Sequence, residues 1–268
     1  MMAEASDWRA PQERFEPPMT DYDRGYARSI PAGRADMAVD AGLRAFMLGV
    51  YNKLALGLVL SGVLAWVTAN VAPVRDLLFQ VTPAGQLAGY TLLGWVVAFA
   101  PLIVILFGSF ALKNPTPRSA GVLYWTIVSL IGASLGTVFL RYTDQSIAST
   151  FFITAAAFGS LSLFGYTTKR DLGPVGSFLI MGLIGLILAS IVNIFLASPM
   201  MQFIISIAGV LIFAGLIAYD TQRLKMTYYQ LGGDQAALGV ATSYGALSLY
   251  LDFINLFQFL LSLLGNRE

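Results

Sequence analysis

Apolar residues dominate the chain from residue 46 onward, in runs long enough to cross a lipid bilayer. A transmembrane helix needs about 20 mainly apolar residues. Seven runs reach that length: 46–69, 86–111, 120–140, 147–166, 175–197, 203–222 and 241–264. The segments between them carry prolines, glycines and charges, which are typical of turns. Because backbone polar groups cannot stay unpaired in lipid, the pattern predicts an all-α integral membrane protein with seven transmembrane helices over residues 45–268.

The first 44 residues differ from the rest of the chain. They hold 14 of its 31 charged residues, and four prolines at positions 11, 17, 18 and 31. Such a segment buries too little apolar surface to fold, so we expect residues 1–44 to form a disordered cytosolic tail. The alternative interpretation is a tail that binds a membrane-protein partner. The tail does not resemble a secretory signal, because no apolar core follows an early basic residue.

The distribution of lysine and arginine predicts the orientation in the membrane. With the N-terminus in the cytoplasm, 13 of the 16 basic residues fall on the tail, the start of the first helix and the cytoplasmic loops. The other side receives Arg75, Arg141 and Arg267. Cytoplasmic loops are rich in Lys and Arg, so we expect a cytoplasmic N-terminus and, after seven spans, an outside C-terminus. Lys53, about two turns into the first helix, is expected to extend to the inner interface.

The amino-acid composition excludes several kinds of catalytic and metal-binding site. Hydrophobic residues make up 57% of the chain and charged residues 12%, about half the charged share of a soluble domain. The chain has no cysteine and no histidine, which excludes disulfides, thiolate zinc sites and Ser–His or Cys–His catalysis. Its net charge of +1 gives no reason to expect a nucleic-acid partner. We expect no enzymatic activity and no resident cofactor.

An aspartate lies well inside the last apolar run. Charged residues within transmembrane segments are costly and usually functional. Helical steps of three and four residues place Asp252 on a polar stripe, which Gln258 borders. The stripe consists of Gly245, Ser248, Asp252, Asn255, Phe259 and Ser262. We expect this face to turn into the bundle or a water-filled path, with Ser248, Asn255 and Gln258 as candidate ion-path residues; a hydrogen-bonded packing aspartate is the alternative.

A second aspartate, Asp220, lies near the inner end of the sixth run. It could pair with Arg223, one turn further on. The sixth and seventh helices are consecutive and are expected to be antiparallel neighbours, so Asp220 and Asp252 could meet, although Asp252 is about two turns deeper. Two adjacent carboxyl groups in a low-dielectric site would share a proton and titrate in coupled steps. Together with nearby carbonyl and amide oxygens, they suit a hard cation such as calcium.

Four segments resemble the transmembrane Bax-inhibitor-motif (Bax inhibitor-one) family, in particular its bacterial members. They are residues 246–257, 217–225, 192–195 and 168–172, and the resemblance covers about 45–266. It implies a seventh helix that is central within a bundle of six, and a pH-sensitive calcium leak. It also implies that Asp220 and Asp252 form the pH sensor and ion gate, with transient calcium binding. In some bacterial members a basic residue near helix 2 latches onto the first aspartate; Lys113 and Arg118 are the candidates here.

Two other functions compete with a channel. An intramembrane aspartyl protease would carry Tyr-Asp and Gly-x-Gly-Asp motifs; Tyr219-Asp220 fits, but the residues before Asp252 are Leu249-Tyr-Leu, without glycine. A membrane protein that regulates proteases or stress and cell-death responses is the other alternative, supported only by the tail. The expected partners are the lipid bilayer, calcium and protons. The lack of cysteine and the many small residues favour a bacterial inner membrane.

Overall fold

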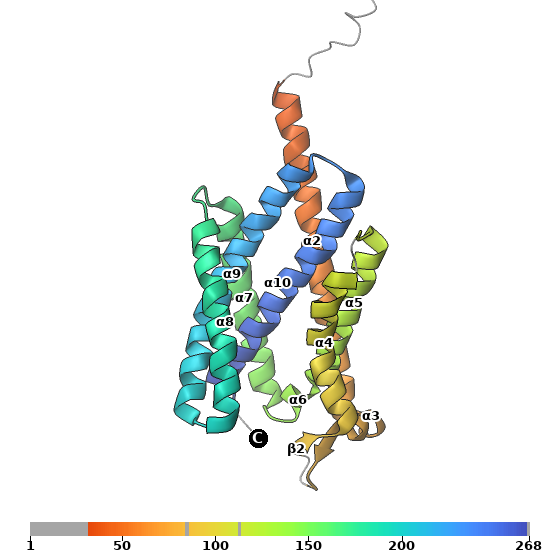
Figure 1. Ribbon diagram of the computed structural model, residues 1–268, viewed down its shortest axis with the longest axis vertical. Coiled ribbons are helices and arrows are strands. Elements are labelled where there is room, and N and C mark those ends of the chain that lie inside the picture. The colour runs from red at the N-terminus through yellow and green to blue at the C-terminus, as the bar shows by residue number, and fades with distance from the viewer. Residues whose placement is uncertain (1–31, 84–85, 112–113, 267–268) are drawn as a thin grey trace, which may run out of the picture. The chain divides into compact units, whose positions relative to one another are not determined.

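The computed structural model describes residues 32–83, 86–111 and 114–266, with backbone only for 32–40 and 109–111. The described chain is almost entirely helical, apart from one two-stranded hairpin (Figure 1). The elements are α2 (Ala32–Asn70), α3 (Ala72–Leu78), β1 (Phe79–Val81), β2 (Leu87–Tyr90), α4 (Leu92–Ala111), α5 (Pro117–Ser134), α6 (Gly136–Phe139), α7 (Asp144–Thr167), α8 (Gly173–Leu196), α9 (Pro199–Leu231) and α10 (Gln235–Leu264).

Six of these helices are long and apolar enough to cross a membrane, and α4 contributes a shorter apolar stretch, Leu92–Gly108. The prediction of an all-α membrane protein is therefore confirmed. The six spans are Ala41–Asn70, Pro117–Phe139, Asp144–Thr167, Gly173–Leu196, Pro199–Leu231 and Gln235–Leu264. A seventh span through α4 stays a prediction.

The predicted helix over 86–111 begins too early, because residues 87–90 form strand β2, paired antiparallel with β1. Thr91 separates the strand from the helix: its hydroxyl donates to the Leu77 carbonyl at 2.6 Å and accepts from the Gly94 amide at 3.0 Å. A Cβ at Gly94 would overlap the Leu78 carbonyl oxygen, so this close approach requires glycine. The hairpin therefore sets the start of α4 at Leu92.

The chain divides into two units, residues 1–42 and 43–268. Residues 1–31 of the predicted tail lie outside the described residues. From Ala32, directly after the last of the four prolines, the described backbone is helical, so the end of that segment belongs to α2. The following description concerns the second unit.

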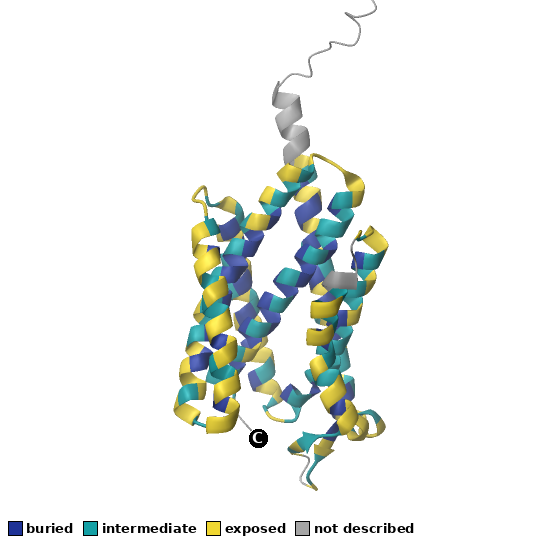
Figure 2. Cartoon of the chain, in the orientation of Figure 1, coloured by how far each residue is buried: buried dark blue, intermediate teal, exposed yellow. Residues whose placement is uncertain are grey.

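Helix α10 is the central helix of the second unit. Half of its most apolar stretch is buried, compared with a third or less in the other spans. It packs against α9, α5 and α7, while α8 packs against α9 and α4 against α5. Figure 2 shows the buried residues turned toward α10 and the exposed ones on the outside of α8 and α4. This arrangement agrees with the expectation that the last helix is central.

Candidate functional site

The segment from Asp220 to Lys225 of α9 contacts several neighbouring elements. The Thr221 hydroxyl bonds to Ser162 of α7 at 3.0 Å, and the Lys225 ammonium donates to the Tyr166 carbonyl at 3.0 Å. In the same segment, Gln222 bonds to two backbone groups of the α7–α8 connection at 2.8 Å each. Sequence reasoning missed these anchoring side chains. Their signal was a run of polar residues at the end of an otherwise apolar helix.

Asp220 connects α9 to α10. Its carboxylate accepts a short hydrogen bond from the Ser248 hydroxyl of α10 and forms an ion pair with Arg223 at 3.3 Å. The Arg223 guanidinium also donates to the Ser248 hydroxyl at 3.3 Å. The ion pair that the sequence spacing allowed is therefore present, and Ser248 is a partner of Asp220.

Asp252 lies beside this group and is itself 6% exposed. Its Oδ2 atom is buried and has no hydrogen-bond partner among the residues that the structure describes. Asp252 and Asp220 line the same cavity, and Ser248, one turn before Asp252 on α10, bonds to the Asp220 carboxylate. Because two carboxylates are both acceptors, a bond between them requires a proton. The structure thus brings together the two predicted aspartates.

Asp220 and Asp252 approach each other, although the sequence places Asp252 deeper in the membrane, because of the way in which α9 and α10 run. Both α9 and α10 extend beyond the apolar runs, to Leu231 and from Gln235 respectively. Figure 1 shows α10 running obliquely between the α8–α9 and α4–α5 pairs. Asp220 consequently lies against the turn of α10 that carries Ser248 and Asp252.

A cavity of about 680 Å³ opens beside the aspartates, with walls from α4, α8, α9 and α10. Its charged lining residues are Asp220, Arg223 and Asp252, and Ser248 and Asn255 add polar groups. The remaining walls are mainly Leu and Ile side chains of α4 and α8. A volume in this range is typical of ligand sites, and here the charged groups lie on its α9–α10 side.

Two further cavities continue toward the opposite end of the bundle. One of about 430 Å³ shares Asn255 and Phe259 with the cavity beside the aspartates and includes Gln258. The next, of about 830 Å³, shares Arg141, Gln202 and Ser262 with the second. Asn255 thus lies where two cavities meet, and its amide nitrogen donates to the Leu251 carbonyl at 2.7 Å. The three cavities adjoin one another from Arg223 to Arg141.

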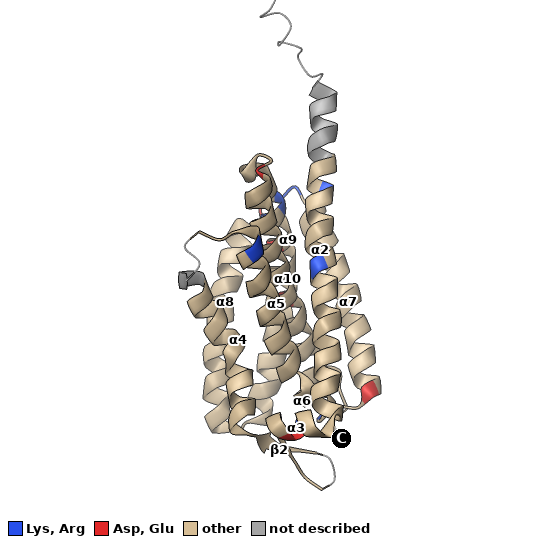
Figure 3. Ribbon diagram, turned by 90° about the vertical axis from the view of Figure 1, so that its right-hand side faces the viewer, with Lys and Arg blue, Asp and Glu red and all other residues tan. Residues whose placement is uncertain are grey.

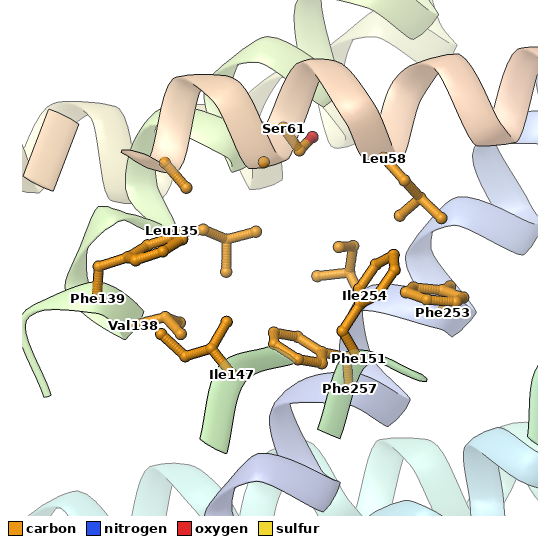
Figure 4. A pocket seen from close by; sticks show the side chains of 12 residues that line it. Leu58, Ser61, Leu135, Val138, Phe139, Ile147, Phe151, Phe253, Ile254 and Phe257 are labelled. Carbon is orange, nitrogen blue, oxygen red and sulfur yellow. The ribbon is translucent and has the colours of Figure 1, made fainter. Parts of the chain in front are cut away.

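A smaller cavity of about 90 Å³ on another side of α10 has a different character. Figure 4 shows it surrounded by aliphatic and aromatic side chains, with Ser61 as its polar member. The Ser61 hydroxyl is already bonded to the Tyr250 hydroxyl at 2.6 Å and the Val128 carbonyl at 3.1 Å. This apolar cavity therefore offers a ligand no charge and no free polar group.

The structure describes one of the two candidate latch residues. Lys113 lies outside the described residues, and Arg118 is exposed on the first turn of α5. Within the described part of the chain, the ion pair of Asp220 is with Arg223, not with Arg118. A latch from Lys113 or Arg118 stays a prediction.

Lys53 is partly buried and joins three helices. Its ammonium donates to the Ser243 hydroxyl of α10 at 2.7 Å and lies 5.5 Å from the ring centroid of Tyr124 on α5. The Tyr124 hydroxyl in turn donates to the Lys53 carbonyl at 2.7 Å. The lysine therefore turns toward α10 rather than simply extending to the interface.

The described residues contain no group of three or more Asp, Glu, His or Cys side chains arranged to hold a metal ion. Two carboxylates, the Ser248 hydroxyl and the Asn255 carbonyl oxygen are the oxygen ligands that this site offers a hard cation. Structural calcium sites use six to eight oxygens, more than these side chains supply.

Comparison with known proteins assigns most of the chain to the family that its sequence segments resemble. The family described as "Inhibitor of apoptosis-promoting Bax1" matches residues 43–268. The chain belongs to the Bax inhibitor family. Among its relatives in this family, a protein of Caulobacter vibrioides is 70% identical over 251 residues, which cover 93% of this chain and 100% of the relative.

More distant members match over nearly the same length. A Rickettsia prowazekii protein is 43% identical over 243 residues, covering 91% of this chain and 98% of the relative. The inner membrane protein YbhL of Escherichia coli K12 is 42% identical over 238 residues, covering 88% of this chain and 98% of YbhL. This Bax inhibitor family member is thus a multi-pass integral membrane protein.

Proposed function

We propose that this protein is a calcium-permeable leak whose rate is controlled by proton exchange at Asp220 and Asp252. The observation that carries the proposal is the unpartnered Oδ2 of Asp252, buried beside Asp220 at a cavity. Charged groups within a bundle mark ion or proton paths. The adjoining cavities and the polar residues Asn255 and Gln258 provide such a path.

The proton count of the pair determines the response to pH. In this proposal a single proton is held by Asp252, and Asp220 keeps its bonds to Arg223 and Ser248. Losing this proton leaves an uncompensated buried charge, which separates α9 from α10 or recruits a cation. Gaining a second proton removes the charge that holds Arg223. We therefore expect the leak to be slowest when the pair holds one proton, and to rise on both sides.

Two other titratable groups, Lys53 and Tyr124, lie against other parts of the α10 surface. Lys53 of α2 contacts Ser243, and Tyr124 of α5 packs edge-on against Tyr250 with ring centroids 6.4 Å apart. Tyr219 lines the aspartate cavity and lies against the Arg223 guanidinium. We assign the pH response to the two carboxyl groups, which are the acidic residues lining that cavity.

We further propose a bacterial inner membrane location with the N-terminus in the cytoplasm. The location rests on the relative YbhL, which is named an inner membrane protein. The orientation rests on charge: Figure 3 shows the Lys and Arg residues of the described part gathered toward the end where α9 joins α10. That end includes Arg118, Arg170 and Lys225, and the other end has Arg75 and Arg141.

The test is calcium efflux from loaded lipid vesicles that contain the purified protein. We expect efflux above that of protein-free vesicles, with a minimum along the pH axis. Replacing both Asp220 and Asp252 with alanine should flatten the pH profile. Asp76→Asn is the matched control, because Asp76 is an exposed aspartate of α3 paired only with Arg75. An unchanged rate and profile in the double variant would contradict the proposal.

A further inference from the structure

We propose that the cavity beside Asp252 binds a singly charged amphiphilic amine, with the ammonium group at Asp252 and the alkyl chain between α4 and α8. The inference concerns the same aspartates as the leak but does not depend on calcium transport. It rests on three features of the cavity: its opening toward lipid, its charge balance and its unpartnered acceptor.

The apolar walls of the cavity belong to the outer surface of the bundle. Leu102 of α4 is 54% exposed, and Ile191 and Ile194 of α8 are 48% and 75% exposed, yet all three line the cavity. In a membrane-spanning bundle, exposed Leu and Ile side chains at these positions face lipid tails. An alkyl chain can therefore enter the cavity from the bilayer, because the lipid tails that it leaves and the cavity walls that it meets are both apolar.

The charges at the inner wall leave room for one cation. Among the residues lining the cavity, Asp220 and Asp252 are acidic and Arg223 is basic. Arg223 and Ser248 already bond to Asp220. With both carboxylates ionised the group carries one net negative charge, which a single ammonium neutralises.

The unpartnered atom identifies where the ammonium binds. No hydrogen-bond partner for the buried Oδ2 of Asp252 is found among the described residues, and Asp252 as a whole is 6% exposed. A buried acceptor of this kind is costly unless a donor reaches it, and an ammonium group offers three donors. Charge-assisted bonds are roughly twice as strong as neutral ones, so the amine is preferred over an alcohol of the same length.

The apolar cavity of Figure 4 serves as an internal comparison. Its lining residues carry no charge, and the hydroxyl of Ser61 is engaged. A probe that binds through its ammonium should label the aspartate cavity preferentially.

The experiment is photo-cross-linking in phosphatidylcholine nanodiscs with dodecylamine that carries a diazirine near the end of its chain. Mass spectrometry of the labelled full-length protein should place adducts on the cavity faces of α4 and α8, including Leu102 and Ile191. Dodecanol with the same diazirine is the neutral probe and should show about tenfold less labelling there, the effect of losing a charge-assisted hydrogen bond. Equal labelling by amine and alcohol would overturn the proposal.

Asp252→Asn keeps the side-chain shape and removes the charge, so amine labelling of these faces should also fall by about tenfold. Asp76→Asn, remote from the cavity, should label like the wild type; undiminished labelling in Asp252→Asn would overturn the proposal. If Asp252→Asn does not fold, competition on the wild type decides: unlabelled dodecylamine must displace the probe and dodecanol must not. Labelling reports no calcium flux, so this proposal and the leak succeed or fail separately.

Discussion

Arg223 is expected to restrain the leak, and Arg223→Gln should accelerate it. The guanidinium lies 3.3 Å from the Asp220 carboxylate and 3.3 Å from the Ser248 hydroxyl, so it holds α9 against α10 at the edge of the aspartate cavity. Glutamine removes the positive charge and leaves a shorter polar side chain. The arrangement of α9 and α10 seen in the structure should then be less favoured.

The contribution of the Arg223–Asp220 ion pair follows from how far the two side chains are exposed. The Arg223 side chain is 49% exposed and that of Asp220 is 8% exposed. Exposed ion pairs contribute roughly 0.2–1 kcal/mol because solvent screens them. The burial of Asp220 places this pair near the upper limit, about 1 kcal/mol. That corresponds to about a fivefold shift between the two arrangements, and hence to about a fivefold faster leak near the pH of slowest efflux.

The assay is calcium efflux from vesicles that contain equal amounts of protein. Arg223→Lys retains a charge and should recover part of the slow rate, since lysine lacks the paired geometry of arginine. Arg170→Gln is the matched control: Arg170 is exposed in the connection between α7 and α8, and its loss should leave the rate unchanged. A faster leak in Arg118→Gln with no change in Arg223→Gln would refute this reasoning and favour the latch at Arg118.

Three further outcomes are expected. Gly94→Ala should lower the free energy of unfolding in detergent by roughly 1–3 kcal/mol, because the added Cβ overlaps the Leu78 carbonyl. Gly62→Ala should leave it unchanged, because a Cβ there meets nothing within 4 Å. Thr221→Val should cost about 1 kcal/mol of stability, the value of one buried hydrogen bond. Thr227→Val, which removes an exposed hydrogen bond to the Arg223 carbonyl, should be neutral; equal losses would contradict the packing described. Deleting residues 1–31 should leave calcium efflux unchanged, and a changed rate would assign the tail a part in the leak.

Helix positions were predictable where the signal is local. Long apolar runs indicate membrane spans because the bilayer sets their length, and the fourth to seventh runs lie within α7 to α10 apart from one residue at the end of α8. The start of the 86–111 run was misassigned because Leu87 and Tyr90 suit a strand and a helix alike. Thr91 and Gly94 marked the boundary, but their contacts with Leu78 form only in the folded chain.

The site was predictable in its residues but not in its geometry. An aspartate deep in an apolar run stands out in any sequence, and so did Asp252. Its approach to Asp220 depends on the oblique course of α10 and on helices that extend beyond their apolar runs, which are tertiary properties. The spacing of Asp220 and Arg223 allowed their ion pair, but the contacts of both side chains with Ser248 required the structure.

Calcium efflux of Asp252→Asn, measured as pH is raised, tests the central claim most directly. Asparagine cannot ionise, and its amide can donate to Asp220 as a protonated Asp252 would. The account predicts that the wild type leaks faster above the pH of slowest efflux, that Asp252→Asn stays at its slow rate over that range, and that both accelerate on acidification. A wild-type alkaline response that persists in Asp252→Asn would contradict the assignment of Asp252 as the proton-exchanging group.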